Sequence, residues 1–412
     1  MPLKRKAPTT PTTVTRACGR VTRAIGTLSA LPLATPACAA PATAAPHGRA
    51  LLSQPAAASE PLLRLGDLLP GVVVRRPSAR NRSPYVGDVQ LADGRIAIAH
   101  MPSLDMGGKC IAGAEVRLKR ALLKSGEPVG DSATGKYGTP KCEFILQLVK
   151  VLEPENASVG GAWVGAHPAI GERLAKALLE RGVVRGVSPC VGLKREVTGV
   201  AGTDMRADFV LSHANGDRSV VEVKTVVDTD RDPAAEALPA TADAAGAADA
   251  AATADAAATA KAPARAPKGG APKGGAPKGG CVFYGRTVPY MRSAIFPWGN
   301  SRQVGPEGER VVSARAIKHV RELTAVARGL RVDEGEEGAL RAAVLFIVTR
   351  GDAQSFRPNE EACPSFARYL REAEEGGVTL AAHKIEWGES GDAFDAGPLE
   401  VDLASQPPLE VS

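Results

Sequence analysis

The chain has 412 residues, of which 44% are hydrophobic and 23% charged, and its formal net charge is +6. This composition is typical of a globular protein and excludes a wholly disordered chain. The charge is uneven, because residues 1–59 contain seven Lys or Arg and no carboxylate, which leaves −1 for the rest of the chain. The total alone therefore does not identify a nucleic-acid partner for the folded part.

Residues 1–59 are rich in Ala, Thr, Pro and Arg, a composition that favours a transit peptide for a plastid or mitochondrion. The alternatives are a disordered basic tail or a secretory segment ending near residues 39–40, and the cytoplasm or nucleus is the alternative location. Four prolines interrupt the apolar part of this leader: Pro32, Pro36, Pro41 and Pro46. It therefore cannot form a transmembrane helix, and we expect no membrane partner.

Residues 60–155 contain five short patterns typical of β-strands. We expect them at residues 72–74, 85–90, 96–98, 114–118 and 143–152. Strands of this number and spacing suit a small barrel, and an oligonucleotide-binding (OB) type barrel is among the candidates.

Residues 156–230 and 281–388 alternate helix and strand patterns, which indicates an α/β domain. The expected helices cover residues 168–182, 312–328 and 365–375, and the expected strands cover 207–211, 219–227, 342–348 and 378–387. Residues 231–280 are rich in Ala, Pro, Lys and Gly, and we expect a disordered insertion there. Residues 389–412 carry six carboxylates and no Lys or Arg, and they are expected to form a solvated acidic tail.

Candidate catalytic residues flank the turn at Asn215-Gly216. On a strand, Glu222 and Lys224 share one face. A two-residue turn would pair Asp208 with Val223, on the wrong face. A three-residue loop that includes Asp217 would pair Asp208 with Lys224, so a shared site requires the longer loop or a bulge.

If these side chains converge, the carboxylates of Asp208 and Glu222 can hold Mg²⁺, which prefers oxygen ligands. Lys224 would then orient or deprotonate an attacking water and neutralise charge on a phosphate. Glu196 would add a third carboxylate to the metal site. Spacing alone also fits a half-exposed hairpin face with a solvated ion pair.

Several separated segments occur in the order found in one known family. They are Asp204–Phe209, Val221–Val226, Phe296-Pro297, Arg315–Leu323 and Phe356-Arg-Pro358. Together they resemble the sugar fermentation stimulation protein A (SfsA) family, over about Leu65 to Trp387. The resemblance implies an N-terminal OB-like β-barrel followed by a PD-(D/E)XK nuclease-like α/β domain, and a DNA-binding role.

Carried over by position, the resemblance places Asp208, Glu222 and Lys224 on a nuclease-type catalytic triad and matches Glu196 to a preceding glutamate. It also implies a basic helix for nucleic acid, formed by Arg315, Lys318 and His319. A second basic set lies on the expected barrel and consists of Arg75, Arg76, Arg80 and Arg82. Aromatic residues are scarce there, so backbone contact is favoured over sequence reading.

These patterns predict a non-sequence-specific DNA-binding protein related to the sugar fermentation stimulation family. The alternative is a Mg²⁺-dependent nuclease that cleaves phosphodiester bonds with Asp208, Glu222 and Lys224. A scaffold that has lost both activities is the third interpretation.

Overall fold

The computed structural model describes residues 60–103, 106–232, 290–300, 302–332 and 338–404. The chain divides into two units, Met1–Ala56 and Ala57–Ser412, and every described element belongs to the second. The expected transit peptide lies outside the described residues. The same holds for the expected insertion beyond residue 232.

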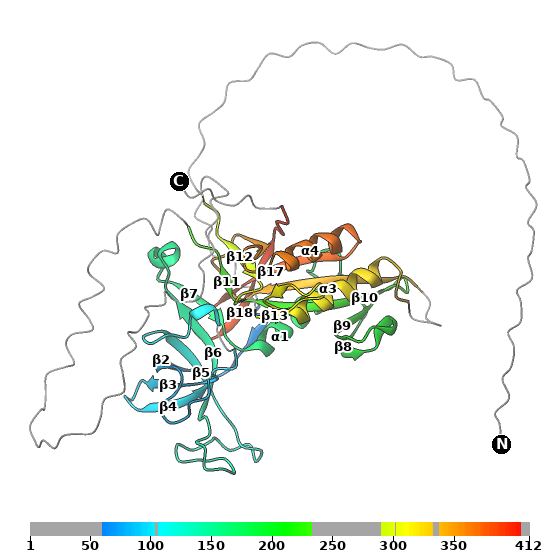
Figure 1. Cartoon of the computed structure of the whole chain (residues 1–412). Helices are drawn as coiled ribbons and strands as arrows, with labels where there is room; N and C mark the ends of the chain where they lie inside the picture. The colour runs from blue at the N-terminus through cyan, green and yellow to red at the C-terminus, as the bar shows by residue number, and fades with distance from the viewer. Residues whose placement is uncertain (1–59, 104–105, 233–289, 301, 333–337, 405–412) are drawn as a thin grey trace, which may run out of the picture. The chain divides into compact units, whose positions relative to one another are not determined.

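The first half of the described chain closes into a five-stranded barrel (Figure 1). Its strands are β2 (Leu69–Arg75), β3 (Val86–Leu91), β4 (Ile96–His100), β5 (Glu115–Arg120) and β6 (Phe144–Val151). They follow the order β4-β3-β2-β5-β6, and β4 closes the barrel by pairing in parallel with β6. This order is that of an OB-type barrel and confirms the five expected strands.

Apolar side chains fill the interior of the barrel, because every second residue of each strand points inward. Val116 and Leu118 of β5 are fully buried, as are Leu146 of β6 and Val89 of β3. A short strand, β7 (Ala162–Gly165), adds to β6 and leads into the second half of the chain.

The second half is built on a seven-stranded sheet of order β1-β18-β17-β15-β10-β9-β8. Its strands are β1 (Leu63–Arg64), β8 (Gly192–Thr198), β9 (Arg206–Ser212), β10 (Arg218–Val226), β15 (Leu340–Val348), β17 (Thr379–Trp387) and β18 (Asp392–Leu399). The central strands β10, β15 and β17 are parallel, and the outer pairs are antiparallel. Both faces are covered, which explains the continuous apolar run of β15.

One helix covers one face of this sheet and two cover the other. Helix α1 (Pro168–Glu180) packs on the face of Val221 and Val223, whereas α3 (Ala314–Ala327) and α4 (Pro364–Glu375) pack on the opposite face. All three expected helices are therefore confirmed. None of the helices in the described ranges is long and apolar enough to span a membrane.

Several short elements connect these layers. They are β11 (Asp228–Thr229), β12 (Ser293–Phe296), β13 (Gln303–Val304), β14 (Arg310–Val311) and β16 (Ser355–Pro358), with the 3₁₀ turns η1 (Met106–Gly108), η2 (Pro154–Val159) and η3 (Val200–Gly202). Strands β11, β12 and β16 form a small sheet, and β13 pairs with β14.

The expectation of a solvated tail from residue 389 is wrong for its first part. Strand β18 pairs with β17 and with β1, so it belongs to the sheet. Ala393 is fully buried against the core, while Asp392 and Asp395 stay partly exposed. The density of carboxylates concealed a strand that buries only its small and apolar side chains.

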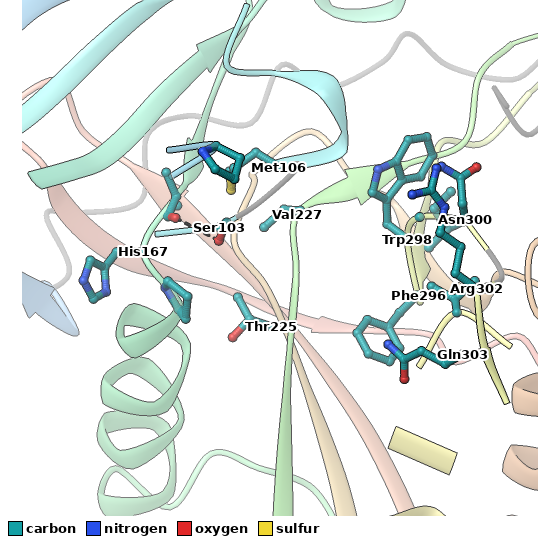
Figure 2. A pocket seen from close by; sticks show the side chains of 17 residues that line it. Ser103, Met106, His167, Thr225, Val227, Phe296, Trp298, Asn300, Arg302 and Gln303 are labelled. Carbon is teal, nitrogen blue, oxygen red and sulfur yellow. Dashed lines mark hydrogen bonds between the residues drawn. The ribbon is translucent and has the colours of Figure 1, made fainter. Parts of the chain in front are cut away.

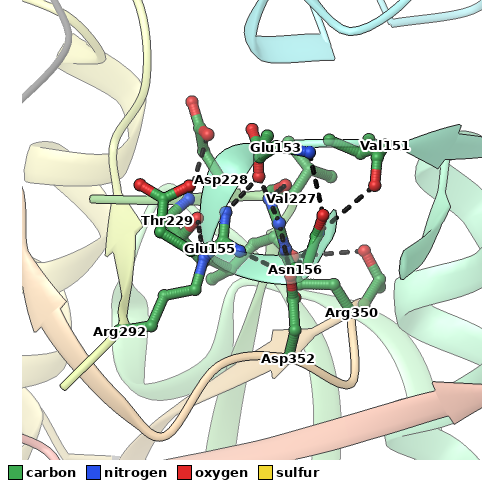
Figure 3. Close-up of polar contacts among 12 residues, drawn as sticks. Val151, Glu153, Glu155, Asn156, Val227, Asp228, Thr229, Arg292, Arg350 and Asp352 are labelled. Atoms are coloured by element: carbon green, nitrogen blue, oxygen red, sulfur yellow. Dashed lines mark hydrogen bonds and ion pairs between the residues drawn. The ribbon is translucent and has the colours of Figure 1, made fainter. Parts of the chain in front are cut away.

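A buried cluster of ionised side chains joins the barrel to the sheet (Figure 3). Arg350, fully buried after β15, donates to Glu153, which follows β6, with an Nη2–Oε2 distance of 2.7 Å. Its Nε also donates to Asp352 at 2.7 Å. Arg292, before β12, contacts both carboxylates as well. The cluster thus links three separate chain segments in a region with little water to screen charge.

Burial opposes ionisation of Glu153, but the charges of Arg350 and Arg292 lower its pKa to about 2. Because the pKa of Glu153 in the folded protein lies below its ordinary value, the ionised carboxylate stabilises the folded state. This stabilisation is complete above about pH 5 and is lost as the pH falls towards 2.

We expect Arg350→Met to lower the free energy of unfolding by about 3–5 kcal/mol at pH 7, because it leaves Glu153 and Asp352 short of a counter-charge. Urea unfolding at pH 7 and pH 3 measures this, and the loss should shrink at pH 3. The control is Arg341→Met, whose surface pair with Asp217 should contribute far less because solvent screens it. If the two variants lost the same free energy of unfolding, the buried cluster would contribute no more than a surface pair, which would contradict this prediction.

Candidate functional site

The β9–β10 hairpin decides how the predicted triad is arranged. The loop has three residues, Ala214 to Gly216, and is closed by the amide of His213 donating to the carbonyl of Asp217 at 2.8 Å. A shared site required a three-residue loop or a bulge, and the loop has three residues but begins one residue earlier than the loop considered from the sequence. The register pairs Phe209 with Val221, so Asp208 falls opposite Glu222 and not Lys224.

Asp208, Glu222 and Lys224 nevertheless share one face of the sheet. Asp208 lies opposite Glu222, and Glu222 and Lys224 are two positions apart on β10, so their side chains point to the same side. Regular pairing ends at Phe209, and the Asp208 carboxylate accepts a hydrogen bond from the Val223 amide at 2.7 Å. The side chain thereby replaces a backbone partner and is held beside Glu222.

Glu222 is 3% exposed and lies between β10 and α3. One of its oxygens, Oε1, accepts from His319 Nδ1 at 2.5 Å and from Lys224 Nζ. The other oxygen, Oε2, is buried and has no hydrogen-bond partner in the part of the chain that the structure describes. A buried carboxylate oxygen without a partner is unusual and indicates a ligand position.

The pKa values of the two carboxyl groups are shifted in opposite directions. Burial and the neighbouring charge of Glu222 raise the pKa of Asp208 to about 6. Burial also disfavours the ionised form of Glu222, but the His319 hydrogen bond and the charge of Lys224 lower its pKa overall. Groups whose environments separate their pKa values in this way are common at functional sites.

Glu196 is not brought to these carboxylates. Its backbone has a φ of 51° within β8, and its half-exposed side chain pairs with Arg206 at 3.6 Å. Across the described residues, no group of three or more His, Cys, Asp or Glu side chains is placed to hold a metal ion. The pair Asp208 and Glu222 is thus the part of the predicted metal site that the structure assembles.

The three residues predicted to form a basic surface on α3 do not point in the same direction. His319 is turned inward to Glu222, whereas Lys318 is exposed and pairs with Asp204 at 2.7 Å. Arg315 is exposed on the same helix. The family resemblance assigned His319 to nucleic acid by position, although the residue falls on the apolar side of α3 with Val320 and Leu323.

On the barrel, two loops meet: residues 76–85, between β2 and β3, and residues 121–143, between β5 and β6. The Asn81 amide donates to the carbonyl of Pro140 at 3.4 Å and connects them. In OB-type barrels these two connections commonly contact oligonucleotides. We refer to them together as the loop end of the barrel.

The four predicted arginines play different parts at the loop end. Arg76 holds the loop by donating to the carbonyls of Ser103 at 2.7 Å and Pro84 at 2.8 Å. Arg75 donates to the carbonyl of Pro77, and Arg80 donates to that of Ile96. Arg82 is exposed and makes no hydrogen bond or ion pair with any described residue, which leaves its guanidinium available.

The second loop adds groups that the sequence did not single out for binding. Tyr137 is 87% exposed, and the Lys136 ammonium lies 5.7 Å from its ring centroid. Lys141 is exposed nearby in the sequence. An exposed tyrosine within a Gly- and Lys-containing stretch was the available signal.

A pocket of about 760 Å³ lies between the barrel and the sheet (Figure 2). Ser103 and Met106 contribute from the barrel side, and Phe296 and Trp298 contribute from β12 and the segment after it. Asp208, Glu222 and Lys224 do not line it. Thr225, the residue after Lys224 on β10, does.

Comparisons with known proteins agree with this architecture. A family model, the sugar fermentation stimulation protein RE domain, matches residues 311–391. A sugar fermentation stimulation protein homolog of Syntrophotalea carbinolica is 24% identical over 77% of this chain and 91% of its own length. A homolog of Caldanaerobacter subterraneus subsp. tengcongensis is 40% identical over 76 residues, which are 18% of this chain and 29% of that protein.

Among solved structures, Pyrococcus furiosus SfsA in complex with Ca²⁺ is similar, with a TM-score of 0.50 and 18% identity. The match covers 84% of this chain and 100% of that one, so it includes both the barrel and the sheet. The family model and the relatives support the assignment of this chain to the sugar fermentation stimulation protein family, and the solved structure shows the same fold.

Proposed function

We propose that this protein binds DNA without sequence specificity through the loop end of the barrel. The observation that supports this most is the contact between the loops of residues 76–85 and 121–143, because it gathers their cationic groups at one place. Exposed Lys and Arg side chains neutralise phosphates, a contact that carries no sequence information.

Tyr137 supports the same proposal. A tyrosine that is 87% exposed offers its ring face to an unpaired base, and base–aromatic stacking tolerates any sequence. Single-stranded DNA is therefore the form that this end of the barrel suits best.

We expect the double variant Arg82→Ala/Lys136→Ala to weaken DNA binding about tenfold at low salt and to reduce the slope of log Kd against log salt by about 2. Fluorescence anisotropy of the full chain with labelled single- and double-stranded 20-mers of several sequences measures both quantities. The matched control is Lys176→Ala/Arg185→Ala, which removes the same charge from α1 and the loop after it. The proposal fails if this control weakens binding equally or if the protein does not bind DNA at low salt.

A second candidate function, a Mg²⁺-dependent nuclease, is supported by the arrangement of Asp208 and Glu222. Two adjacent carboxylates, one with a buried oxygen that lacks a partner among the described residues, suit a divalent cation with oxygen ligands. When bound, such an ion polarises a phosphoryl oxygen and lowers the pKa of its water. The Ca²⁺ held by the related Pyrococcus furiosus protein is a cation of the same hard type.

The neighbouring side chains suit this candidate. His319 and Lys224 both hold Glu222 Oε1, so the carboxylate is fixed and its second oxygen is directed elsewhere. Lys224 also places a positive charge near the two carboxylates, where a phosphate group would be repelled without it.

We expect the full chain to cut single-stranded DNA with Mg²⁺ or Mn²⁺ but not with EDTA, and Asp208→Asn to lower the rate at least a hundredfold. Because the folded-state pKa of Asp208 lies above its ordinary value, ionising it costs stability above about pH 6. Asp208→Asn should therefore be more stable than the wild type at pH 8 by about 1–2 kcal/mol, so that unfolding does not explain lost cleavage.

The control for this experiment is Asp204→Asn, which changes an exposed carboxylate near the start of β9. It should leave cleavage unchanged. No cutting with any metal, while DNA still binds, would leave the protein as a DNA-binding protein without nuclease activity.

A further inference from the structure

We propose that the pocket between the barrel and the sheet binds a single nucleotide, with its base between the apolar walls and its phosphate at Arg302. This inference extends the proposed DNA binding, on which it rests for the case of a nucleotide within a strand. A free nucleotide has the same chemistry.

The walls of the pocket suit a flat, largely apolar group. Phe296 and Trp298 lie on one side and Met106 on the other, with Val227 of the β10–β11 connection between them (Figure 2). Aromatic side chains in such a wall favour a heteroaromatic ring, which stacks or packs against their faces. The volume of about 760 Å³ is within the range of small-molecule and cofactor sites.

The charge of the lining favours an anion. Arg302 lines the pocket, and none of the described Asp or Glu side chains does. Arg302 forms no ion pair within the described ranges, so its guanidinium is available for bidentate contact with a phosphate. A neutral sugar would leave this charge without a partner.

One polar group is already oriented for a base edge. Gln303 Oε1 accepts from the backbone amide of Ala314 at 2.9 Å, at the start of α3. This bond fixes the amide plane and leaves its Nε2 as the donor to a ligand oxygen. Trp298 adds a second donor, since its buried Nε1 has no acceptor among the described residues.

The position of the pocket connects it to the loop end of the barrel. Pro84, from the barrel loop of residues 76–85, lies at one border, and Thr225 of β10 lies at another. A strand held at the loop end of the barrel can therefore place one nucleotide in the pocket, whereas Asp208, Glu222 and Lys224 lie on the other face of β10 from Thr225. The structure thus favours an unstacked nucleotide as the occupant.

Isothermal titration of the full chain in EDTA with thymidine 5′-monophosphate tests the proposal. We expect binding, and at least tenfold weaker binding of thymidine, which lacks the phosphate, and of deoxyribose 5-phosphate, which lacks the base. Trp298→Ala and Arg302→Ala should each weaken nucleotide binding at least tenfold. Trp298→Phe should stay within about threefold of the wild type, because it keeps an aromatic ring.

Arg64→Ala, which removes an exposed arginine of β1, is the matched control and should leave nucleotide binding unchanged. A 12-mer with one abasic position distinguishes the two sources of nucleotide: weaker binding than the intact 12-mer indicates a nucleotide within a strand, and equal binding indicates a free one. The proposal is overturned if thymidine 5′-monophosphate does not bind, if both pocket variants bind it like the wild type, or if glucose displaces it. Neither DNA binding at the barrel loops nor metal-dependent cutting enters the titration with thymidine 5′-monophosphate, so either can fail while the nucleotide binds the pocket.

Discussion

The buried charges around Glu153 and Arg350 are the constraint on which the rest of the structure depends. They lie where the barrel ends and the sheet begins, and they bring together segments that follow β6, precede β12 and follow β15. A buried carboxylate needs its counter-charge, so these segments can pack in few other ways. The pocket, which takes residues from both halves, depends on this arrangement.

The buried carboxylates of this chain lie in two different electrostatic environments. Glu153 is surrounded by arginines and is held ionised, as a structural group. Burial and the charge of Glu222 raise the pKa of Asp208, and Glu222 Oε2 has no hydrogen-bond partner among the described residues. Stability alone does not explain this second arrangement, because an apolar pair would cost less to bury. This arrangement is the basis of the nuclease candidate.

Much of the fold could be predicted because its signals are local. The alternating barrel strands and the apolar stripes of α1, α3 and α4 are periodic in sequence, and the shared face of Asp208, Glu222 and Lys224 follows from strand parity and loop length. What was missed depends on distant partners. Glu196 pairs with Arg206 at the edge strand β8, His319 turns to Glu222 because α3 packs on that face of the sheet, and β18 was hidden by its carboxylates. The ion cluster joins residues about 200 positions apart, and no local pattern predicts it.

The central claim is that the loop end of the barrel holds DNA. Hydrogen exchange of the full chain, with and without a single-stranded 20-mer at low salt, tests it most directly because it locates the contact without altering a residue. The account predicts slower exchange in peptides covering residues 76–85 and 121–143. Protection confined to α3, or bound DNA with no protection in either barrel loop, would contradict it.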